Sequence, residues 1–475
     1  MLLVSHPKTY PAERAYALDV VLREFLGLEW EAHVQEGANA QITVAHTSDD
    51  GRLVIADCLF STPEPLWLTR ESLPERPLAR WNLDGETHLA SRLLSPELPI
   101  IYGRRLDAGS FYEQSAGEIR LGVDIFGGIF FQLTRYEEIA ETSRDAHDRF
   151  PAEASLAHVE GFLDRPLVNE YVEVLWTALE RMWPGLPRKE HAFTERLSHD
   201  VDWPEHTPVT APRMTKAAIG DLVRRRDGGQ ALARLRAMRA RRRGDPAGDP
   251  YNTFDFIMDH SERRGLQSAF YFMAGATNTA FDGTYSLEDP WIGELIRRLH
   301  DRGHEIGLHP SYETFRDPDA VHAEREALVR ACARLGVEQA EWGGRQHYLR
   351  WENPTTWSAW EQAGLAYDSS LGFSHDPGFR CGVCFEYPVF DLSARRRLRL
   401  RERPLVVMEM ALFHNSAISS RQGLEALERL RDQCKQFGGE FTLLWHNSRL
   451  ASRRERRLYA AALGGESASG FDGSD

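Results

Sequence analysis

Hydrophobic positions in the second half of the chain fall into short apolar runs separated by longer stretches with helical spacing. The apolar runs predict strands at 193–198, 267–272, 305–308, 341–344, 365–367, 405–410 and 440–445. Helical patterns lie between most of them, at 253–264, 291–302, 319–335, 355–363 and 421–437. Strands that alternate with helices are typical of a parallel sheet, which is either open or closed into a barrel.

The first part of the chain follows a mixed pattern instead. It combines helical stretches at 12–28, 124–139 and 166–183 with short alternating runs at 52–56 and 118–123. The charged cluster at 135–138 is interpreted as a salt-bridged helix end rather than a site. A Pro/Gly-rich segment at 183–187 marks a boundary. We therefore expect an α+β accessory domain at 1–188, a second domain at 189–460, and a disordered tail at 461–475.

Composition narrows the class of protein. Hydrophobic residues make up 42% of the 475 residues, enough to fill a core, so the chain is not wholly disordered. No apolar run approaches the ~18 residues of a membrane-spanning helix. The first residues lack the charged leader and the apolar core of an export signal. Five cysteines, an odd and sparse set, argue against a disulfide framework. We therefore expect a cytoplasmic protein.

The net charge of −14 is unevenly distributed along the chain. The segment 213–243 carries 11 Lys or Arg and two Asp, a balance of +9, so the remainder carries −23. This excess of negative charge argues against nucleic acid as a partner of the bulk of the protein. The segment lies in a basic insertion at 204–250, and its apolar stripes are backed by arginine, as in helices that lie on anionic surfaces. It is either a flexible insert or a peripheral contact with a membrane or a phosphate-bearing carrier.

Reactive side chains follow the predicted strands of the second domain. In chain order they are Asp200, Asp202, His309, Arg345, His347, Asp368 and His446. The C-terminal ends of the strands of a parallel barrel meet at one mouth. Of two neighbouring carboxylates, one can bind a divalent metal while the other takes a proton from the attacking water. Histidine suits zinc and similar ions, and a further histidine can protonate a leaving group. The pattern therefore indicates metal-assisted hydrolysis of an amide or an ester.

Residues 193–450 resemble the NodB-type polysaccharide deacetylases, metal-dependent hydrolases that remove N-acetyl or related acyl groups from sugars. The resemblance implies a distorted (β/α) barrel. Its motifs here are His199-Asp200-Val201-Asp202, in the spelling of the lipid-linked sugar deformylases, Gly303-His304-Glu305-Ile306-Gly307-Leu308-His309, Arg345, Asp368-Ser369 and Leu443-Leu444-Trp445-His446. The N-terminal part looks like the accessory domain found ahead of some bacterial deacetylases of surface-polysaccharide loci.

The resemblance implies a role for each matched residue. Asp200 is the expected base and Arg345 the residue that orients it. Asp202 and His309 are the expected ligands of a divalent metal, with zinc as the expected ion. His446 is the expected general acid.

Two positions depart from the family pattern. The usual second metal histidine, four residues after His309, is Glu313, and the proline common in the third motif is His347. Both side chains are acceptable zinc ligands. Glu313 can instead be a solvated helix residue, and His347 can instead contact the substrate. Because His347 lies at a strand end whereas Glu313 depends on a local helical turn, we expect His347 to complete the metal site.

The expected substrate contacts are Tyr348 and Trp351, whose flat rings suit sugar faces, together with Asp368. The favoured function is removal of an N-acetyl or related acyl group from an amino sugar in bacterial surface polysaccharide or lipopolysaccharide biosynthesis. The sugar can be linked to a nucleotide or a lipid carrier. The alternatives are a catalytically silent relative that binds carbohydrate and a membrane-surface scaffold that uses the basic segment.

Overall fold

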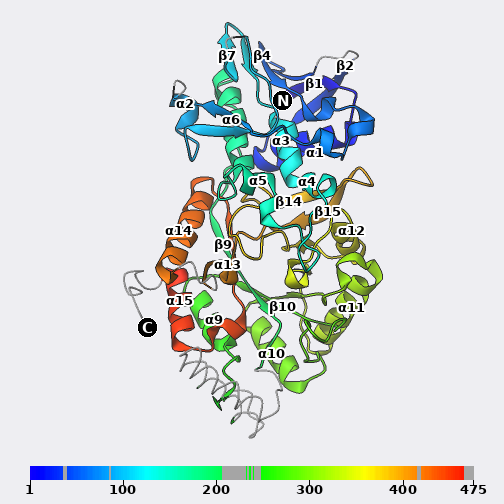
Figure 1. Cartoon of the computed structure of the whole chain (residues 1–475), viewed down its shortest axis with the longest axis vertical. Coiled ribbons are helices and arrows are strands. Elements are labelled where there is room, and N and C mark those ends of the chain that lie inside the picture. The colour runs from blue at the N-terminus through cyan, green and yellow to red at the C-terminus, as the bar shows by residue number, and fades with distance from the viewer. Residues whose placement is uncertain are drawn as a thin grey trace.

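A computed structural model of the protein describes residues 1–35, 40–84, 87–107, 109–205, 248–413 and 419–464, with the single positions 232, 235, 236 and 239. Its elements form two groups along the long axis, one around each of two large sheets (Figure 1). Apart from the four single positions, the basic segment 213–243 lies outside the described residues, as do residues 465–475 of the expected tail.

The N-terminal group is built on a six-stranded mixed sheet. Its strands, in spatial order, are β2 (Trp30–Gln35), β1 (Leu2–Pro7), β3 (Gln41–His46), β4 (Asp49–Ala56), β8 (Glu118–Leu121) and β7 (Tyr112–Ser115). A separate hairpin pairs β5 (Ala79–Asn82) with β6 (Glu97–Ile100). The helices are α1 (Pro11–Asp19), continued by a π-helical stretch at Val20–Phe25, α2 (Thr87–Ala90), α3 (Ile125–Leu133), α4 (Glu137–Ala140), α5 (Leu156–Val159) and α6 (Leu167–Met182). The α+β pattern expected for this part is therefore present.

The second group is built on a nine-stranded sheet. Its order is β14 (Tyr387–Asp391), β15 (Arg396–Glu402), β13 (Tyr367–Asp368), β12 (Gly343–Gly344), β11 (Glu305–Leu308), β10 (Ser268–Phe272), β9 (Thr194–Val201), β17 (Glu440–Leu444) and β16 (Val407–Met408). Neighbouring strands are parallel except in the β14–β15 hairpin. The helices are α9 (Phe254–Glu262), α10 (Pro290–Asp301), α11 (Pro318–Arg334), α12 (Thr355–Gln362), α13 (Glu409–Phe413), α14 (Ser420–Gln436) and α15 (Arg453–Ala462). The prediction of a parallel sheet is confirmed.

The structure departs from the expected fold in three places. Among the described strands β14 and β16 do not pair, so the sheet has two edges and closure into a barrel stays a prediction. The single helix expected at 124–139 is broken, because Arg135 adopts a left-handed φ of 52° between α3 and α4. Helix α15 ends at Ala462, two residues into the expected tail.

Short 3₁₀ turns complete the described elements. They lie at Leu59–Ser61, Glu64–Leu66, Arg70–Ser72, Ala152–Ala154, Thr314–Arg316, His347–Leu349 and Asn447–Leu450.

The two groups share one continuous apolar core. Phe130 of α3 packs edge-to-face on Phe390 of β14, with ring centroids 5.4 Å apart. The Tyr16 hydroxyl of α1 donates to the Pro388 carbonyl oxygen at 2.8 Å. The division into two domains stays a prediction, because these contacts join the two groups in one interior.

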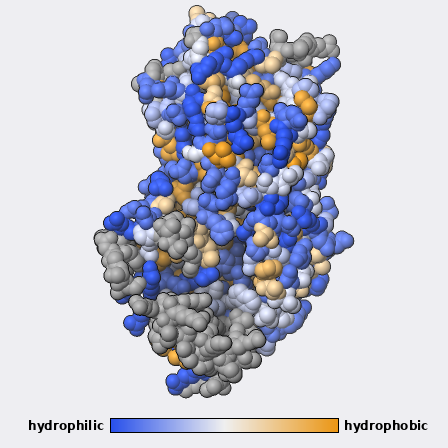
Figure 2. All heavy atoms as spheres, viewed as in Figure 1, coloured by the Kyte–Doolittle hydropathy of each residue, from blue (hydrophilic) through white to orange (hydrophobic). Residues whose placement is uncertain are grey.

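None of the helices that the structure describes is both long enough and apolar enough to cross a membrane. The face in Figure 2 is largely hydrophilic, with small apolar groups over the N-terminal part.

Candidate metal and catalytic site

Strand β9 carries two carboxylates toward the C-terminal edge of its sheet. Side chains alternate along a strand, so Asp200 and Asp202 share one face while His199 points to the other. His199 is 1% exposed, stacks on Phe270 and lies with Nδ1 2.7 Å from the Trp445 carbonyl oxygen, so it is a packed structural histidine. Of the residues in this motif, Asp200 and Asp202 are therefore the ones that face the candidate site.

His309 follows β11 and turns toward Asp202. Its Nδ1 lies 2.6 Å from the Arg345 carbonyl oxygen, which can only accept, so Nδ1 carries a proton. In the neutral ring Nε2 therefore presents a lone pair, and it lies 3.1 Å from Asp202 Oδ1. Burial lowers the pKa of His309, but the negative charges of Asp200 and Asp202 outweigh burial and raise it. This field attracts a cation to the space between the side chains.

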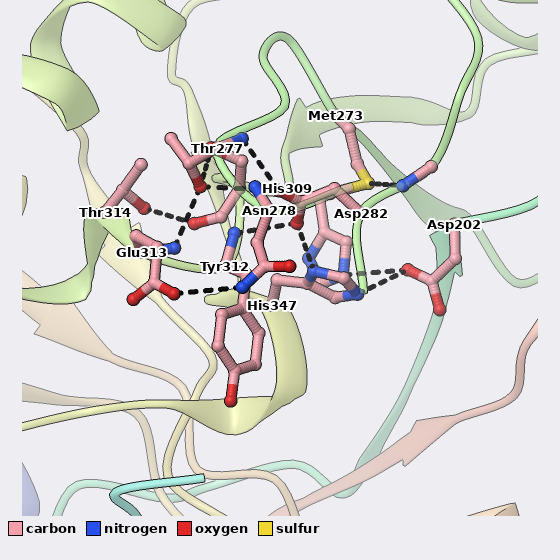
Figure 3. A network of polar contacts seen from close by, with 12 residues as sticks. Asp202, Met273, Thr277, Asn278, Asp282, His309, Tyr312, Glu313, Thr314 and His347 are labelled. Atoms are coloured by element: carbon pink, nitrogen blue, oxygen red, sulfur yellow. Dashed lines mark hydrogen bonds and ion pairs between the residues drawn. The ribbon is translucent and has the colours of Figure 1, made fainter. Parts of the chain in front are cut away.

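His347 approaches the same carboxylate oxygen from the turn after β12. Its Nδ1 lies 3.0 Å from Asp282 Oδ1, and its Nε2 lies 3.5 Å from Asp202 Oδ1 (Figure 3). Asp282 is fully buried and is held in turn by the backbone N–H groups of Thr277, Asn278 and Tyr312, at 2.7–2.8 Å. A carboxylate that accepts from Nδ1 fixes the ring and directs the Nε2 lone pair into the site.

The three residues Asp202, His309 and His347 fit a metal ion. One ligand atom from each lies within 4.8 Å of the others. Asp202 Oδ1 is buried and has no hydrogen-bond donor among the described residues, because the histidine protons sit on the opposite nitrogens. A carboxylate oxygen and two imidazole lone pairs that face one another repel unless a cation lies between them. Two histidines and one carboxylate form a donor set that suits zinc and related divalent ions, with a position left open for water.

Arg345 holds Asp200 in place beside the triad. The guanidinium is fully buried, and its Nη1 donates to Asp200 Oδ1 at 2.8 Å. Its other N–H groups donate to Ser198 Oγ at 3.0 Å and to the Ser369 carbonyl oxygen at 2.8 Å. Because Nε and Nη2 bond to these other groups, Arg345 contacts Asp200 through Nη1 alone and engages only its Oδ1. The other, Oδ2, faces the site 3.8 Å from His309 Nε2.

His446 lies on the opposite side of Asp202. Its Nε2 is 3.6 Å from Asp202 Oδ2, and its Nδ1 is 2.7 Å from Glu409 Oε1. Glu409 begins α13 directly after β16 and is fully buried. Burial lowers the pKa of His446, but the charge and hydrogen bond of Glu409, together with the charges of Asp202 and Asp200, outweigh burial and raise it to about 9. Sequence reasoning missed Glu409, although its position at the end of a predicted strand was an available signal.

Glu313 lies away from the metal-ligand triad. Its half-exposed carboxylate accepts from Asn278 Nδ2 at 3.1 Å and from Arg350 Nη1 at 3.0 Å. In Figure 3 it is directed toward Asn278, whereas His309 and His347 face Asp202. The structure therefore brings His347 to the site and leaves Glu313 outside it.

Two of the three expected substrate contacts are buried in the structure. Trp351 is 1% exposed and packs edge-to-face on Trp357, so it is a core residue without a ring face that a sugar can reach. Asp368 is also inaccessible, because it is fully buried and accepts from the Ser370 backbone N–H at 2.9 Å. Burial raises the pKa of Asp368 to about 7. Tyr348 remains half-buried next to His347, with ring centroids 4.8 Å apart, and can still meet a ligand.

Comparison with known proteins gives a family match for the N-terminal part and solved structures that are similar to part of the chain. Residues 1–184 match a family of unknown function, DUF7033. A putative polysaccharide deacetylase from Mycobacterium smegmatis is similar at 17% identity and a TM-score of 0.35, over 59% of this chain and 86% of that one. Puue allantoinase is similar at 13% identity and a TM-score of 0.32, over 60% and 84%.

A third similar structure is the Xyl-CE4 domain of a multidomain xylanase from the hindgut metagenome of Trinervitermes trinervoides. Its identity is 11% and its TM-score 0.25, over 58% of this chain and 81% of that one. Among curated proteins, none matches this chain. Function is therefore inferred from the geometry of the site.

Proposed function

We propose that this protein is a divalent-metal-dependent hydrolase that removes an N-acetyl or related acyl group from an amino sugar. The observation that carries the proposal is the arrangement around Asp202. Two histidine lone pairs converge on this carboxylate, a fixed carboxylate lies on one side of it, and a protonated histidine lies on the other. Such a site supplies a ligand set, a base and an acid together, which is what amide hydrolysis requires.

Each residue has a separate task in this reaction. Asp202, His309 and His347 would hold a divalent ion, which would supply a Lewis acid for the acyl carbonyl and for the attacking water. Asp200 accepts the proton of the attacking water through Oδ2, because Arg345 occupies Oδ1. His446 then gives its Nε2 proton to the nitrogen of the leaving amine, since its Nδ1 proton is held by Glu409.

The protonation state of His446 favours an amide as the bond that is cleaved. An amine is a poor leaving group until its nitrogen is protonated, and the contact of Nδ1 with the buried carboxylate of Glu409, at 2.7 Å, favours the protonated form of His446. The resemblance of the motifs supports an amino sugar of surface polysaccharide biosynthesis, linked to a nucleotide or lipid carrier, with zinc as the ion. A carbohydrate-binding relative without activity is the second candidate, favoured by the replacement of the usual metal histidine by Glu313.

Release of acetate from N-acetylated amino sugars tests the proposal. The parent protein is reconstituted with zinc and compared with Asp200→Asn, which keeps the shape and the metal ligands but removes the base. We expect acetate release by the parent and a loss of at least about 100-fold in the variant, in line with general-base catalysis. Equal rates would contradict the assigned base. Zinc binding without acetate release by the parent, combined with sugar binding, would favour the silent relative.

His446→Ala tests the assigned acid. We expect a large loss of turnover on amides and a smaller loss on activated esters, whose leaving groups need no proton. An equal loss on both substrate types would show that His446 positions the substrate instead.

A further inference from the structure

The N-terminal part of the chain reaches the residues next to the metal-ligand triad. His147 lies in the loop between α4 and α5, about 165 positions before the residue that it contacts, and its Nδ1 is 2.8 Å from the Tyr312 hydroxyl. Its ring lies 4.8 Å from the ring of Tyr348 and 5.5 Å from that of Phe281, measured between centroids. Both tyrosines and Phe281 belong to loops of the second group, so the contact joins the two parts of the chain at the site.

The loop that carries His147 is fixed at both ends of the contact. Asp145 Oδ1 accepts from the backbone N–H of His147 at 2.8 Å and from that of Arg149 at 3.0 Å. Arg149 Nη1 donates to the Tyr348 carbonyl oxygen at 3.0 Å. Arg350 Nε donates to the His147 carbonyl oxygen at 2.9 Å. These bonds run in both directions between the two parts, so the backbone at His147 is held independently of its side-chain contacts.

His147, Phe281, Tyr312 and Tyr348 form an aromatic cluster beside the site. Phe281 stacks on Tyr312 with centroids 4.4 Å apart, and Tyr348 stands edge-on to Tyr312 at 5.3 Å. Tyr312 is buried, whereas the other three are half-buried and keep part of their surface exposed. Tyr348 connects the cluster to the metal ligand His347, whose ring lies 4.8 Å away.

The chemistry of the cluster suits one kind of ligand. Aromatic rings with an apolar face and a polar edge pack on the apolar faces of pyranose rings while they bond to hydroxyl groups. A pyranose bound here lies next to His347 and therefore next to the acyl group that is cleaved. The cluster lies beside the metal ligand His347 and not at the metal ligands themselves, so a sugar bound to it is not the sugar whose acyl carbonyl reacts. The cluster thus fits a sugar unit adjacent to the acylated one.

We propose, resting on the function proposed above, that the aromatic cluster is a second sugar subsite and that His147 is a specificity-determining residue supplied to it by the N-terminal part. The substrate is then an oligosaccharide or a longer glycan. A single acetylated sugar fills only the site at the metal and makes no use of the N-terminal part. This assigns the part of the chain that matches a family of unknown function a direct role in substrate selection.

The test compares two substrates and three variants of the full chain. The substrates are N-acetylglucosamine and its linear tetrasaccharide, and the zinc-reconstituted protein is assayed for acetate release. His147→Ala removes the ring, His147→Phe keeps a ring without its nitrogens, and His33→Ala is the matched control, an exposed histidine on β2. Binding of both sugars is measured in parallel by tryptophan fluorescence on metal-free protein.

We expect His147→Ala to raise the KM for the tetrasaccharide about five- to tenfold, the size of one lost aromatic contact. Its kcat, and both constants for the monosaccharide, should stay within about twofold of the parent. His147→Phe should recover most of the loss, and His33→Ala should match the parent. If His147→Ala matches the parent on both substrates, the subsite is wrong while the proposed function stands. If the parent releases no acetate, the proposed function fails, and the fluorescence titration alone decides the subsite: binding that is weakened in His147→Ala supports it, and unchanged or absent binding overturns it.

Discussion

Glu138 is shared by two arginines in the interior between the two sheets. It is 2% exposed, and its Oε1 accepts from Arg135 Nε at 2.8 Å and from Arg380 Nε at 3.0 Å. Its Oε2 accepts from Arg380 Nη2 at 2.7 Å. Arg135 also pairs with Glu137 at 2.7 Å. The buried network therefore holds two positive and two negative charges. Among the described residues, Glu138 is the only acidic side chain that contacts both Arg135 of the N-terminal part and Arg380.

Glu138→Gln keeps the size of the side chain but leaves one uncompensated positive charge in the interior. Removal of one partner of a buried ion pair costs about 3–5 kcal/mol of stability. For a chain of 475 residues the entropy of unfolding is about 1 kcal/mol per kelvin. We therefore expect Tm to fall by about 3–5 °C, measured by differential scanning calorimetry at pH 7. Glu75→Gln, at an exposed position of the same part, is the control and should change Tm by less than about 1 °C.

The pH dependence separates the charge effect from a packing effect. Burial raises the pKa of Glu138, but Arg380 and Arg135 outweigh burial and hold it below its ordinary value. A depressed pKa in the folded state adds stability above the unfolded pKa of about 4.3, and this stability is lost as the pH falls through the folded pKa. The difference in unfolding free energy between parent and Glu138→Gln should therefore be full at pH 7 and shrink below about pH 4, measured by urea unfolding. Equal stability at pH 7, or a difference that does not change with pH, would refute the reasoning.

Three further predictions concern the metal site. Asp202→Asn should lose bound zinc after dialysis while Asp200→Asn retains it, measured by elemental analysis; equal loss in both would remove the division of roles between the carboxylates. His347→Ala should lose zinc and Glu313→Ala should keep it, and the reverse result would make Glu313 the third ligand. Asp282→Asn should weaken zinc affinity by about 10–100-fold in competition with a chelator, because a neutral amide holds the Nδ1 proton of His347 less strongly than a carboxylate and turns an NH2 group toward N–H donors; unchanged affinity would show that the ring is held by packing alone.

Much of the second sheet could be predicted from its pattern of hydrophobic residues. The buried strands β9, β10, β11 and β17 are short apolar runs between helical stretches, and each lies within three residues of its predicted position. The hairpin of β14 and β15 was missed for a physical reason. Strand β15 places arginines at four of seven positions, a density that hides its alternation of buried and exposed residues. Closure of the sheet depends on contacts between its two edge strands, which the pattern of hydrophobic residues along the chain does not predict.

The residues of the candidate site also fall into a predictable group, at strand ends, and an unpredictable group, in loops. Residues at strand ends were predictable, because the parallel order of strands brings those ends together whatever lies between them. The burial of Trp351 and Asp368 could not be predicted, because residue type indicates a possible contact but not burial. Asp282 and His147 lie in loops, and their contacts with His347 and Tyr312 span 65 and 165 residues. A lone aspartate or histidine at such a distance carries no local signal of its partner.

The dependence of acetate release on bound metal tests whether the protein is a metal-dependent hydrolase. The protein is stripped with a chelator, and zinc is returned in steps while acetate release from an N-acetylated amino-sugar oligosaccharide and bound zinc are both measured. We expect activity to be absent in the stripped protein, to rise in proportion to bound zinc and to saturate at one ion per chain, and we expect Asp202→Asn neither to bind the ion nor to gain activity. Full activity in stripped protein, or zinc bound at one ion per chain by Asp202→Asn, would contradict this expectation.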